Sequence, residues 1–480
     1  MSSSSDERLE RQRHYDAKHR DKRLRQMKEY RAKHRDRQRE YKQEWYRRNR
    51  DLIKQKRLER KAAKPDAATP PSPLALLLSL ELSTHAPDEA NTFFREGSSS
   101  VDTARAVLID MEPKVVLQCH ARAANTGRWV YDKKNHICQQ SGSGNNWAYG
   151  YTVHGSESAE RVFESVQREV EHCDYFKGFH AMQSLAGGTG SGLGSFISDL
   201  LHDQFPHSFL LNTVVWPYHS GEVIVQNYNT LLTMACLSES SDGIFVLRND
   251  VADKICQKLL TIPKPSLDQM NGVLANHIAS VLLPAQTNDA SPRCQLPLIL
   301  QELCSHPGYK LMDVKVVPQL SSRSRAFSAH QWAGVLKHLH QMQIANSSLD
   351  EGVNWDISLD TSPRAVVNKS VGSLLYVRGP DTAAVAADAF LDRRMYCPWA
   401  STPCQVLAST APFNEYDKTA ALLSNSQTML DPIQTMVEKA HCMYASRAYL
   451  HQYAAHGVDT EFFESCFLRL DQLILNYQSL

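Results

Sequence analysis

The sequence predicts an α/β fold built on a parallel sheet, followed by a second α+β domain and a C-terminal helical hairpin. Three observations lead to this fold class. Apolar runs of strand length alternate with amphipathic helices through residues 103–282, which is the order of βαβ units. Residues 175–204 place a glycine-rich string, AGGTGSG, between such a run and such a helix. Shorter strands and helices follow, and two long amphipathic helices end the chain.

The glycine-rich string is the strongest functional signal. Its apolar run holds Phe179 and Leu185, and its helix repeats apolar residues from Leu193 to Leu201 at helical spacing. Backbone N–H groups of such a turn, with the N-terminus of the following helix, can bind a phosphate. Glycine permits this because a Cβ would keep the backbone away from the phosphate oxygens. The predicted phosphate-binding residues are Ala186, Gly187, Gly188, Thr189, Gly190, Ser191 and Gly192.

Two commoner nucleotide motifs are excluded. The chain contains no GxxxxGK[ST], so it lacks a P-loop, and its glycines in this region never reach the spacing GxGxxG. A solvated turn is the alternative interpretation of the string.

A second glycine turn lies in residues 140–155, and a helix is predicted over 156–173 directly after it. Its backbone N–H groups and an amide could contact further phosphate oxygens. The candidate residues are Gly142, Ser143, Gly144 and Asn145.

Two carboxylates follow the first strand of this region, which is predicted over 106–109 as a buried strand. Asp110 and Glu112 stand at its carboxyl end, where a magnesium ion could be held partly through waters. The alternative is a helix N-cap, because Pro113 comes next and proline suits the first helical position. Spacing alone leaves both interpretations open.

AGGTGSG resembles the glycine loop of the tubulin family, a set of guanine-nucleotide-binding proteins that polymerise. The segments ARAVLIDMEP and QSGSGNNWAYGY resemble the family in the same order, and the resemblance covers about residues 103–480. It implies a tubulin/FtsZ-type GTPase domain that binds GTP and Mg²⁺, with Asp110 and Glu112 near the metal. The implied partners are other tubulins and microtubules, without a membrane.

The same resemblance implies which residues contact the ribose and the base of the nucleotide. Gln226 stands at the position that meets the ribose, which is usually acidic in the family, so an amide replaces a charge here. Asn249 and Asn271 fall where the family places asparagines that contact guanine. Leu267, one helical turn before Asn271, replaces an aromatic residue that stacks on the base.

Within the family, three segments look most like the delta-tubulin branch: WPYHSGEVIVQNYN, SGSGNNWAYGY and MLDPIQTMVEKAHCMYASRAYLHQY. That branch is associated with centrioles, basal bodies and cilia. The resemblance therefore implies a cytoskeletal protein of the cytoplasm, placed at the centrosome or the cilium base, with centriolar proteins as partners. Eleven scattered cysteines without a CxxC pair predict reduced thiols in the cytosol or nucleus.

Five segments are predicted along the chain. They are a basic arm, helical or disordered (1–65), a linker with a remnant of the first helix (66–102), the nucleotide-binding domain with its core helix (103–282), an intermediate α+β domain (283–428) and the helical hairpin (429–480). The intermediate domain is expected to contain strands over 311–317, 373–377 and 419–423, and helices over 328–344 and 381–392.

The basic arm is chemically unlike the rest of the chain. Residues 1–65 hold 24 Lys and Arg against 11 Asp and Glu, whereas the remainder holds 29 against 41. Five aromatic residues interleave with these cations, which favours weak, salt-sensitive binding of polyanions. A nucleic-acid-binding protein on a degenerate tubulin-like scaffold is therefore the alternative function, and a solubilising arm is the simplest interpretation.

Two departures from the family bear on activity. Nothing like its first strand and glycine-containing turn precedes residue 103, and the run ALLLSLEL (75–82) looks more like the start of its first helix. We therefore expect poor nucleotide binding and marginal stability. Leu298 matches the acidic residue that orients water for GTP hydrolysis, and Glu302 reads as a solvated helix residue, so GTPase activity is left open. His180 reads as a packed core histidine.

Overall fold

The computed structural model describes residues 93–96, 101–139, 141–219, 221, 223–285, 295–320, 331–359, 368–400 and 402–480. Several predictions lie outside these residues. They are the basic arm, nearly all of the linker, the run ALLLSLEL and the first residues of the helix expected over 328–344.

The main sheet has seven strands. They are β6 (Gly178–Ser184), β7 (Phe209–Trp216), β8 (Gly243–Arg248), β9 (Leu311–Val317), β10 (Ser370–Arg378), β11 (Cys404–Ser409) and β12 (Thr419–Ser426). Their order is β11–β10–β12–β9–β8–β7–β6. From β6 to β9 every pair is parallel, whereas β12 runs antiparallel to both β9 and β10. This parallel half confirms the predicted α/β fold class.

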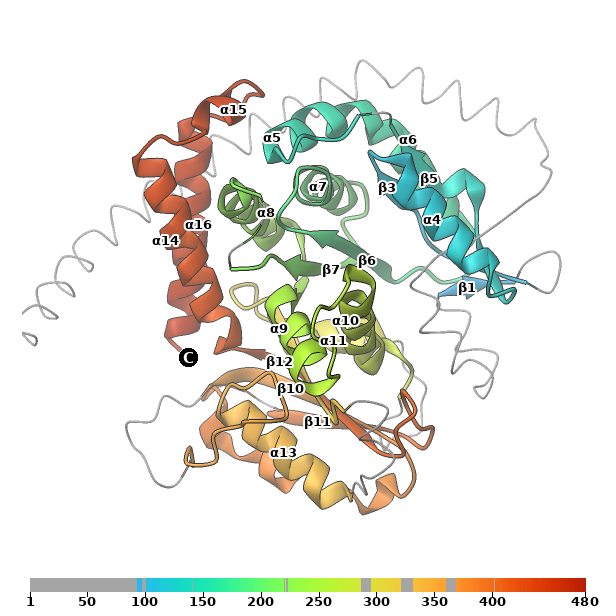
Figure 1. Cartoon of the computed structure of the whole chain (residues 1–480), viewed down its shortest axis with the longest axis vertical. Helices are drawn as coiled ribbons and strands as arrows, with labels where there is room; N and C mark the ends of the chain where they lie inside the picture. Colours follow the sequence, from blue (N-terminus) through green and yellow to red (C-terminus); the bar gives the residue numbers. More distant parts are fainter. Residues whose placement is uncertain are drawn as a thin grey trace, which may run out of the picture. The chain divides into compact units, whose positions relative to one another are not determined.

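The α-helices of the described residues are α4 (Pro113–Ala124), α5 (Trp147–Tyr149), α6 (Gly155–Glu171), α7 (Gly194–Gln204), α8 (Gln226–Ser240), α9 (Asn249–Lys254), α10 (Leu267–Leu282), α11 (Gln295–Leu303), α13 (Trp332–Ile344), α14 (Leu430–Ala445), α15 (Leu450–Ala454) and α16 (Thr460–Gln478). Some of them cover the two faces of the main sheet (Figure 1). α7 and α8 lie over one face of the sheet at β7, and α9, α10 and α11 lie over the other face at β7, β8 and β9. None of the described helices combines the length and the apolar character needed to cross a bilayer.

Several elements begin and end close to where they were expected. β9 has the predicted bounds, 311–317, and β10 and β12 are a few residues longer than predicted. α10 begins with the expected capping box, in which Gln269 N donates to Ser266 Oγ at 3.3 Å and Ser266 N donates to Gln269 Oε1 at 2.8 Å. β8 pairs with β9, so the sheet continues past residue 282, and the domain boundaries stay a prediction.

The strand layer is split beside β6. β3 (Leu108–Asp110) pairs in parallel with β5 (His136–Cys138), and a third sheet joins β1 (Phe94–Arg95), β2 (Asp102–Ala104) and β4 (Trp129–Tyr131). In the described parts of the chain, β3 pairs only with β5 and β6 only with β7. Side chains of β3, β5 and β6 nevertheless share one apolar cluster with α6. These strands therefore pack on the same helix without forming one sheet.

Two element predictions are wrong. The buried strand expected over 106–109 is β3, which begins at 108, ends at 110 and is only half-buried. The helix expected over 381–392 consists of two 3₁₀ turns, Thr382–Ala384 and Asp388–Leu391. Only Phe390 is buried among its described side chains, so a regular helix would have no continuous face to pack.

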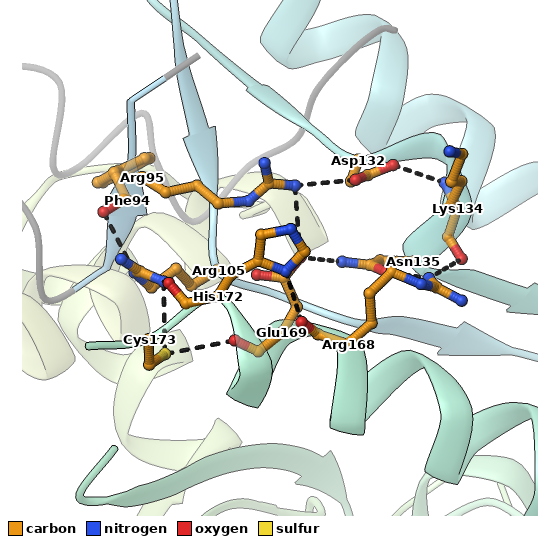
Figure 2. Close-up of polar contacts among 10 residues, drawn as sticks. All are labelled: Phe94, Arg95, Arg105, Asp132, Lys134, Asn135, Arg168, Glu169, His172 and Cys173. Carbon is orange, nitrogen blue, oxygen red and sulfur yellow. Dashed lines mark hydrogen bonds and ion pairs between the residues drawn. The ribbon is translucent and has the colours of Figure 1, made fainter. Parts of the chain in front are cut away.

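A network of polar side chains anchors β1 to the end of α6 (Figure 2). Arg95 Nη2 donates to Asp132 Oδ2 at 2.8 Å and to Glu169 Oε1 at 3.4 Å. Glu169 is buried, and its Oε1 also accepts from Asn135 Nδ2 at 2.5 Å. Such pairing offsets the cost of burying a carboxylate. The C-terminal end of α6 is thereby fixed, and its other end leads back to the second glycine turn.

Candidate functional site

The two glycine loops meet at one place. One loop follows β5 and the other follows β6, and the hydroxyl oxygens of Ser143 and Thr189 lie 2.9 Å apart. A Cβ on Gly188 would lie 2.6 Å from the Cβ of Ser143 and 2.8 Å from the backbone nitrogen of Asn146. The loops therefore touch through their backbones. The carboxyl ends of β5 and β6 face a common site, which is where α/β sheets bind ligands.

Each loop leads into a helix, and the two helices approach each other at glycines. Asn146 caps α5, because its Oδ1 accepts from two backbone N–H groups of the first turn. A Cβ on Gly150 would lie 2.2 Å from the carbonyl oxygen of Gly188, and one on Gly192 would lie 2.1 Å from that of Trp147. Only glycine permits this approach. Two helix N-termini thus point to the same place, which favours a bound phosphate.

One buried asparagine of α8 holds both loops. Asn229 Nδ2 donates to the carbonyl oxygens of Asn145 at 2.8 Å and Ala186 at 2.7 Å. Its Oδ1 accepts from Trp147 N at 3.1 Å and from Tyr453 OH at 2.7 Å. The amide therefore uses both of its donors and both of its acceptor positions. Asn229 therefore connects the two glycine loops to each other and to the start of α5.

Two of the glycines predicted to bind phosphate, Gly144 and Gly187, have open space where a side chain would lie. A Cβ on Gly144 would meet nothing within 4 Å, and the nearest atom to one on Gly187 would be Asn145 Oδ1, at 3.5 Å. Gly144 and Asn145 have φ angles of 56° and 55°, the left-handed conformation that turns the loop back. These positions leave room for a phosphate, and the predicted contact with one stays a prediction.

Gly188, Gly190 and Gly192 are needed for packing within the protein. A Cβ on Gly190 would lie 2.4 Å from Ser184 Oγ, and a Cβ on Gly188 or Gly192 would clash with residues 143–147. The Ser191 hydroxyl is buried and donates to the carbonyl of Gly187 within the loop. This side chain is therefore used by the protein, and only the backbone N–H groups of these residues stay candidates for phosphate binding.

The two predicted metal ligands lie beside the second loop. Glu112 Oε1 would be 3.2 Å from a Cβ on Gly142, and Asp110 Oδ1 accepts from Glu112 N at 3.0 Å. Glu112 precedes Pro113 at the start of α4, but its side chain makes no capping hydrogen bond. The described residues include no cluster of three or more His, Cys, Asp or Glu placed to hold a metal. Two carboxylates at a phosphate loop fit a magnesium that the nucleotide shares, and this assignment stays a prediction.

The predicted ribose residue supports the loop in front of α8. Gln226 is buried, and its Nε2 donates to the carbonyl oxygen of Tyr218 at 2.8 Å. Tyr218 OH donates in turn to Met270 Sδ of α10 at 2.8 Å. The amide thus fixes the loop against the helix that is expected to contact the base. Its contact with a ribose stays a prediction.

The two predicted base-contacting residues lie on neighbouring helices. Asn249 begins α9, Asn271 lies on the exposed side of α10, and α9 packs against α10. Asn249 is partly buried and Asn271 is exposed, and their contact with a base stays a prediction. Leu267 is 70% exposed one turn before Asn271, and it offers an open apolar surface next to that amide.

Leu298 is a core residue of α11. It is 5% exposed and belongs to the main apolar cluster of the sheet and its helices. A leucine in this position cannot orient water. Glu302 is partly buried on the same helix, one turn further on.

Comparison with known proteins decides the family. The family model described as "Tubulin/FtsZ family, GTPase domain" matches residues 58–257, a range that begins upstream of 103. Over 404 residues the chain is 42% identical to the tubulin delta chain of Canis lupus familiaris, which covers 81% of this chain and 89% of that one. The chain belongs to the tubulin family. The GTPase-domain match confirms the predicted tubulin/FtsZ-type architecture and implies GTP binding.

Relatives from two branches are similar to this chain to different degrees. The human tubulin delta chain is 40% identical over 404 residues, with 81% of this chain and 89% of the relative covered. The tubulin beta chain of Pyropia yezoensis is 27% identical over 402 residues, with 82% and 83% covered. The similarity to delta-tubulin predicted from the sequence is therefore confirmed. The chain is a tubulin-like cytoskeletal protein.

Sequence reasoning missed three residues that build this tubulin site. Asn146 could have been found, since asparagine in front of a helix is a common N-cap. Asn229 and Tyr453 give no such signal, because each looks like an ordinary helical residue until the fold brings Tyr453 next to α8.

Two histidines, the buried His277 and the partly buried His180, are expected to make this tubulin sensitive to acid. Burial lowers the pKa of His180 and of His277 from 6.5 to about 4. The pKa of each ring is lower in the folded than in the unfolded chain. The unfolding free energy is therefore highest above pH 6.5 and falls as the pH drops below 6.5, because protons then bind the unfolded chain. Each ring should cost about 2 kcal/mol of unfolding free energy between pH 7 and pH 5. Urea unfolding at both pH values measures this loss.

The matched variant for the acid prediction is His180→Asn. His180 is only partly buried, so it is not the core histidine that was predicted, and its Nε2 lies 2.7 Å from Thr213 Oγ1 on the neighbouring strand. The variant should lose about 2 kcal/mol less than wild type over the same pH interval. An equal loss in both proteins would show that His180 is not responsible.

Proposed function

We propose that this chain is a GTP-binding structural protein of the microtubule cytoskeleton that acts at centrioles, basal bodies and cilia. One observation carries the binding part of this proposal. Two glycine loops and two helix N-termini meet at one place, where Ser143 and Thr189 touch and Asn229 bonds both loops. The cellular part rests on the similarity to delta-tubulin chains.

The proposed ligand is GTP with Mg²⁺. Its phosphates would lie against the backbone N–H groups of the two loops, with Asp110 and Glu112 turned toward the metal. Mg²⁺ would neutralise part of the phosphate charge. Gln226, Asn249 and Asn271 would contact the ribose and the guanine base. The partners that follow from this proposal are other tubulins, microtubules and centriolar proteins.

Hydrolysis is not part of the proposal. By its resemblance to the family, Leu298 stands at the position of the acidic residue, and this leucine is buried. Losing a positioned acid or base typically slows a reaction by about 10²–10⁴-fold. When this chain is its own neighbour, turnover should therefore be slow.

Selectivity for guanine should depend on Asn271. Asn271→Leu should weaken GTP binding by about 1–3 kcal/mol, because the polar edge of the base would lose its partner. Fluorescence titration with labelled GTP measures the change. Asn276→Leu, on the same helix α10, is the control and should leave affinity unchanged. Equal losses in the two variants would argue against a base contact at Asn271.

The proposed site of action can be tested in ciliated cells. The full chain carrying a fluorescent tag should concentrate at centrioles and at the base of cilia. Its loss should disturb these structures before it disturbs cytoplasmic microtubules. An even cytoplasmic distribution would contradict the proposed location and leave GTP binding untouched.

A further inference from the structure

Helix α15 contacts the candidate nucleotide site from the C-terminal part of the chain. Tyr453 OH donates to Asn229 Oδ1 at 2.7 Å, and both side chains are fully buried. Next to it, the carbonyl oxygen of Gln452 accepts from Asn146 Nδ2 at 3.0 Å. One residue of α15 thus bonds the amide that joins the glycine loops, and its neighbour bonds the residue that caps α5.

The segment around α15 is tied down by two more contacts. Tyr228, beside Asn229 on α8, donates its hydroxyl to the carbonyl oxygen of Ala448 at 3.1 Å. The ring of Tyr149 packs against that of His456, with centroids 4.9 Å apart. Residues 448–456 therefore contact the start of α5 and α8 at several points, all next to the loops.

We propose that α15 is a positioning element for the nucleotide, and that Tyr453 acts through Asn229 to set how long the nucleotide stays bound. This inference rests on the proposed function. Asn229 can bond both loops only in one orientation of its amide, and Tyr453 supplies one of the two donors to Oδ1 that select this orientation. Without that donor the amide can turn and the loops loosen.

Such coupling is reciprocal, because a group that stabilises the bound form is stabilised by the ligand to the same extent. Bound nucleotide should therefore protect residues 448–456 from exchange with solvent. The C-terminal segment then becomes a place from which a contact outside the site can change nucleotide residence.

The chain contains a matched control for Tyr453. Asn425 Nδ2 donates to the carbonyl oxygens of Leu303 at 2.8 Å and Tyr309 at 2.9 Å. Tyr477 OH donates to Asn425 Oδ1 at 2.6 Å. This arrangement repeats that of Asn229 and Tyr453, and none of its described contacts reaches a glycine loop. Tyr477→Phe thus removes the same group from the same kind of bond.

Hydrogen exchange of the full chain, measured by mass spectrometry, tests the proposal without requiring nucleotide. Tyr453→Phe should speed exchange in peptides that cover residues 141–146 and 186–192, whereas Tyr477→Phe should not. Dissociation of N-methylanthraniloyl-GTP should become about 3–10-fold faster in Tyr453→Phe and stay unchanged in Tyr477→Phe. Unchanged exchange in both loops would overturn the proposal. Loops that respond in a chain that binds no labelled GTP would instead count against the proposed function.

A second variant covers the case in which Tyr453→Phe does not fold. Tyr228→Phe cuts the bond to Ala448 and leaves the hydrogen bonds of Asn229 in place. It should speed exchange in residues 448–456 and, by a smaller factor, in the two loops. Faster exchange in residues 448–456 alone, with unchanged loops, would overturn the proposal.

Discussion

Gly192→Ala is expected to destroy nucleotide binding and to lower the unfolding free energy by about 3 kcal/mol, the upper end of the usual cost of overpacking. The added Cβ would lie 2.1 Å from the carbonyl oxygen of Trp147. That atom is backbone at the start of α5, and the Trp147 side chain is fully buried, so neither can move aside cheaply. Urea unfolding and titration with labelled GTP measure the two effects.

The control for this substitution is Gly334→Ala on α13. A Cβ on Gly334 would meet nothing within 4 Å. Alanine in a helix is favoured over glycine by about 1 kcal/mol, so this variant should be slightly more stable and should bind nucleotide as wild type does. If Gly192→Ala behaved like Gly334→Ala, the close approach of the two helices would not exist in the protein.

Asn229→Ala is expected to cost about 3–5 kcal/mol of unfolding free energy and to abolish nucleotide binding, since each buried polar group left unpaired costs roughly 1–3 kcal/mol. The substitution removes the hydrogen-bond partner of two carbonyl oxygens, one backbone N–H and the Tyr453 hydroxyl. Both loops lose their common partner at the same time. Urea unfolding measures the loss of unfolding free energy, and titration with labelled GTP measures the loss of nucleotide binding.

Asn425→Ala separates the loss of stability from the loss of binding. Asn425 is fully buried and bonds two carbonyl oxygens and a tyrosine hydroxyl, as Asn229 does. Its replacement should destabilise the fold by a similar amount and leave nucleotide affinity unchanged in the folded fraction. A similar loss of affinity in both variants would mean that Asn229 has no special role at the site.

The parts of the fold that could be predicted are those whose local sequence preference agrees with the structure that the whole chain adopts. Five of the seven residues of β9 (LMDVKVV) are apolar, and its predicted bounds are those observed. α10 begins with Ser266 and Gln269, whose capping box depends only on neighbours in the chain. AGGTGSG lies between strand and helix for the same local reason.

The parts that could not be predicted depend on contacts distant in sequence. The alanine-rich segment 381–392 has good helix formers but little to bury, so its propensity did not decide its structure. Gly188, Gly190 and Gly192 were assigned to phosphate approach, whereas the structure shows that protein atoms would occupy the space of their Cβ atoms. The bond between Tyr453 and Asn229 joins residues 224 positions apart, which no local pattern reveals.

The central claim is that the place where the two glycine loops meet holds a guanine nucleotide. Competition on the purified full chain tests it most directly. Labelled GTP is bound first, and unlabelled GTP and ATP are then titrated against it in the presence of Mg²⁺. The account predicts that GTP displaces the label at much lower concentration than ATP, because Asn249 and Asn271 offer amides to the guanine edge. Equal displacement by GTP and ATP, or no binding of the label at all, would contradict it.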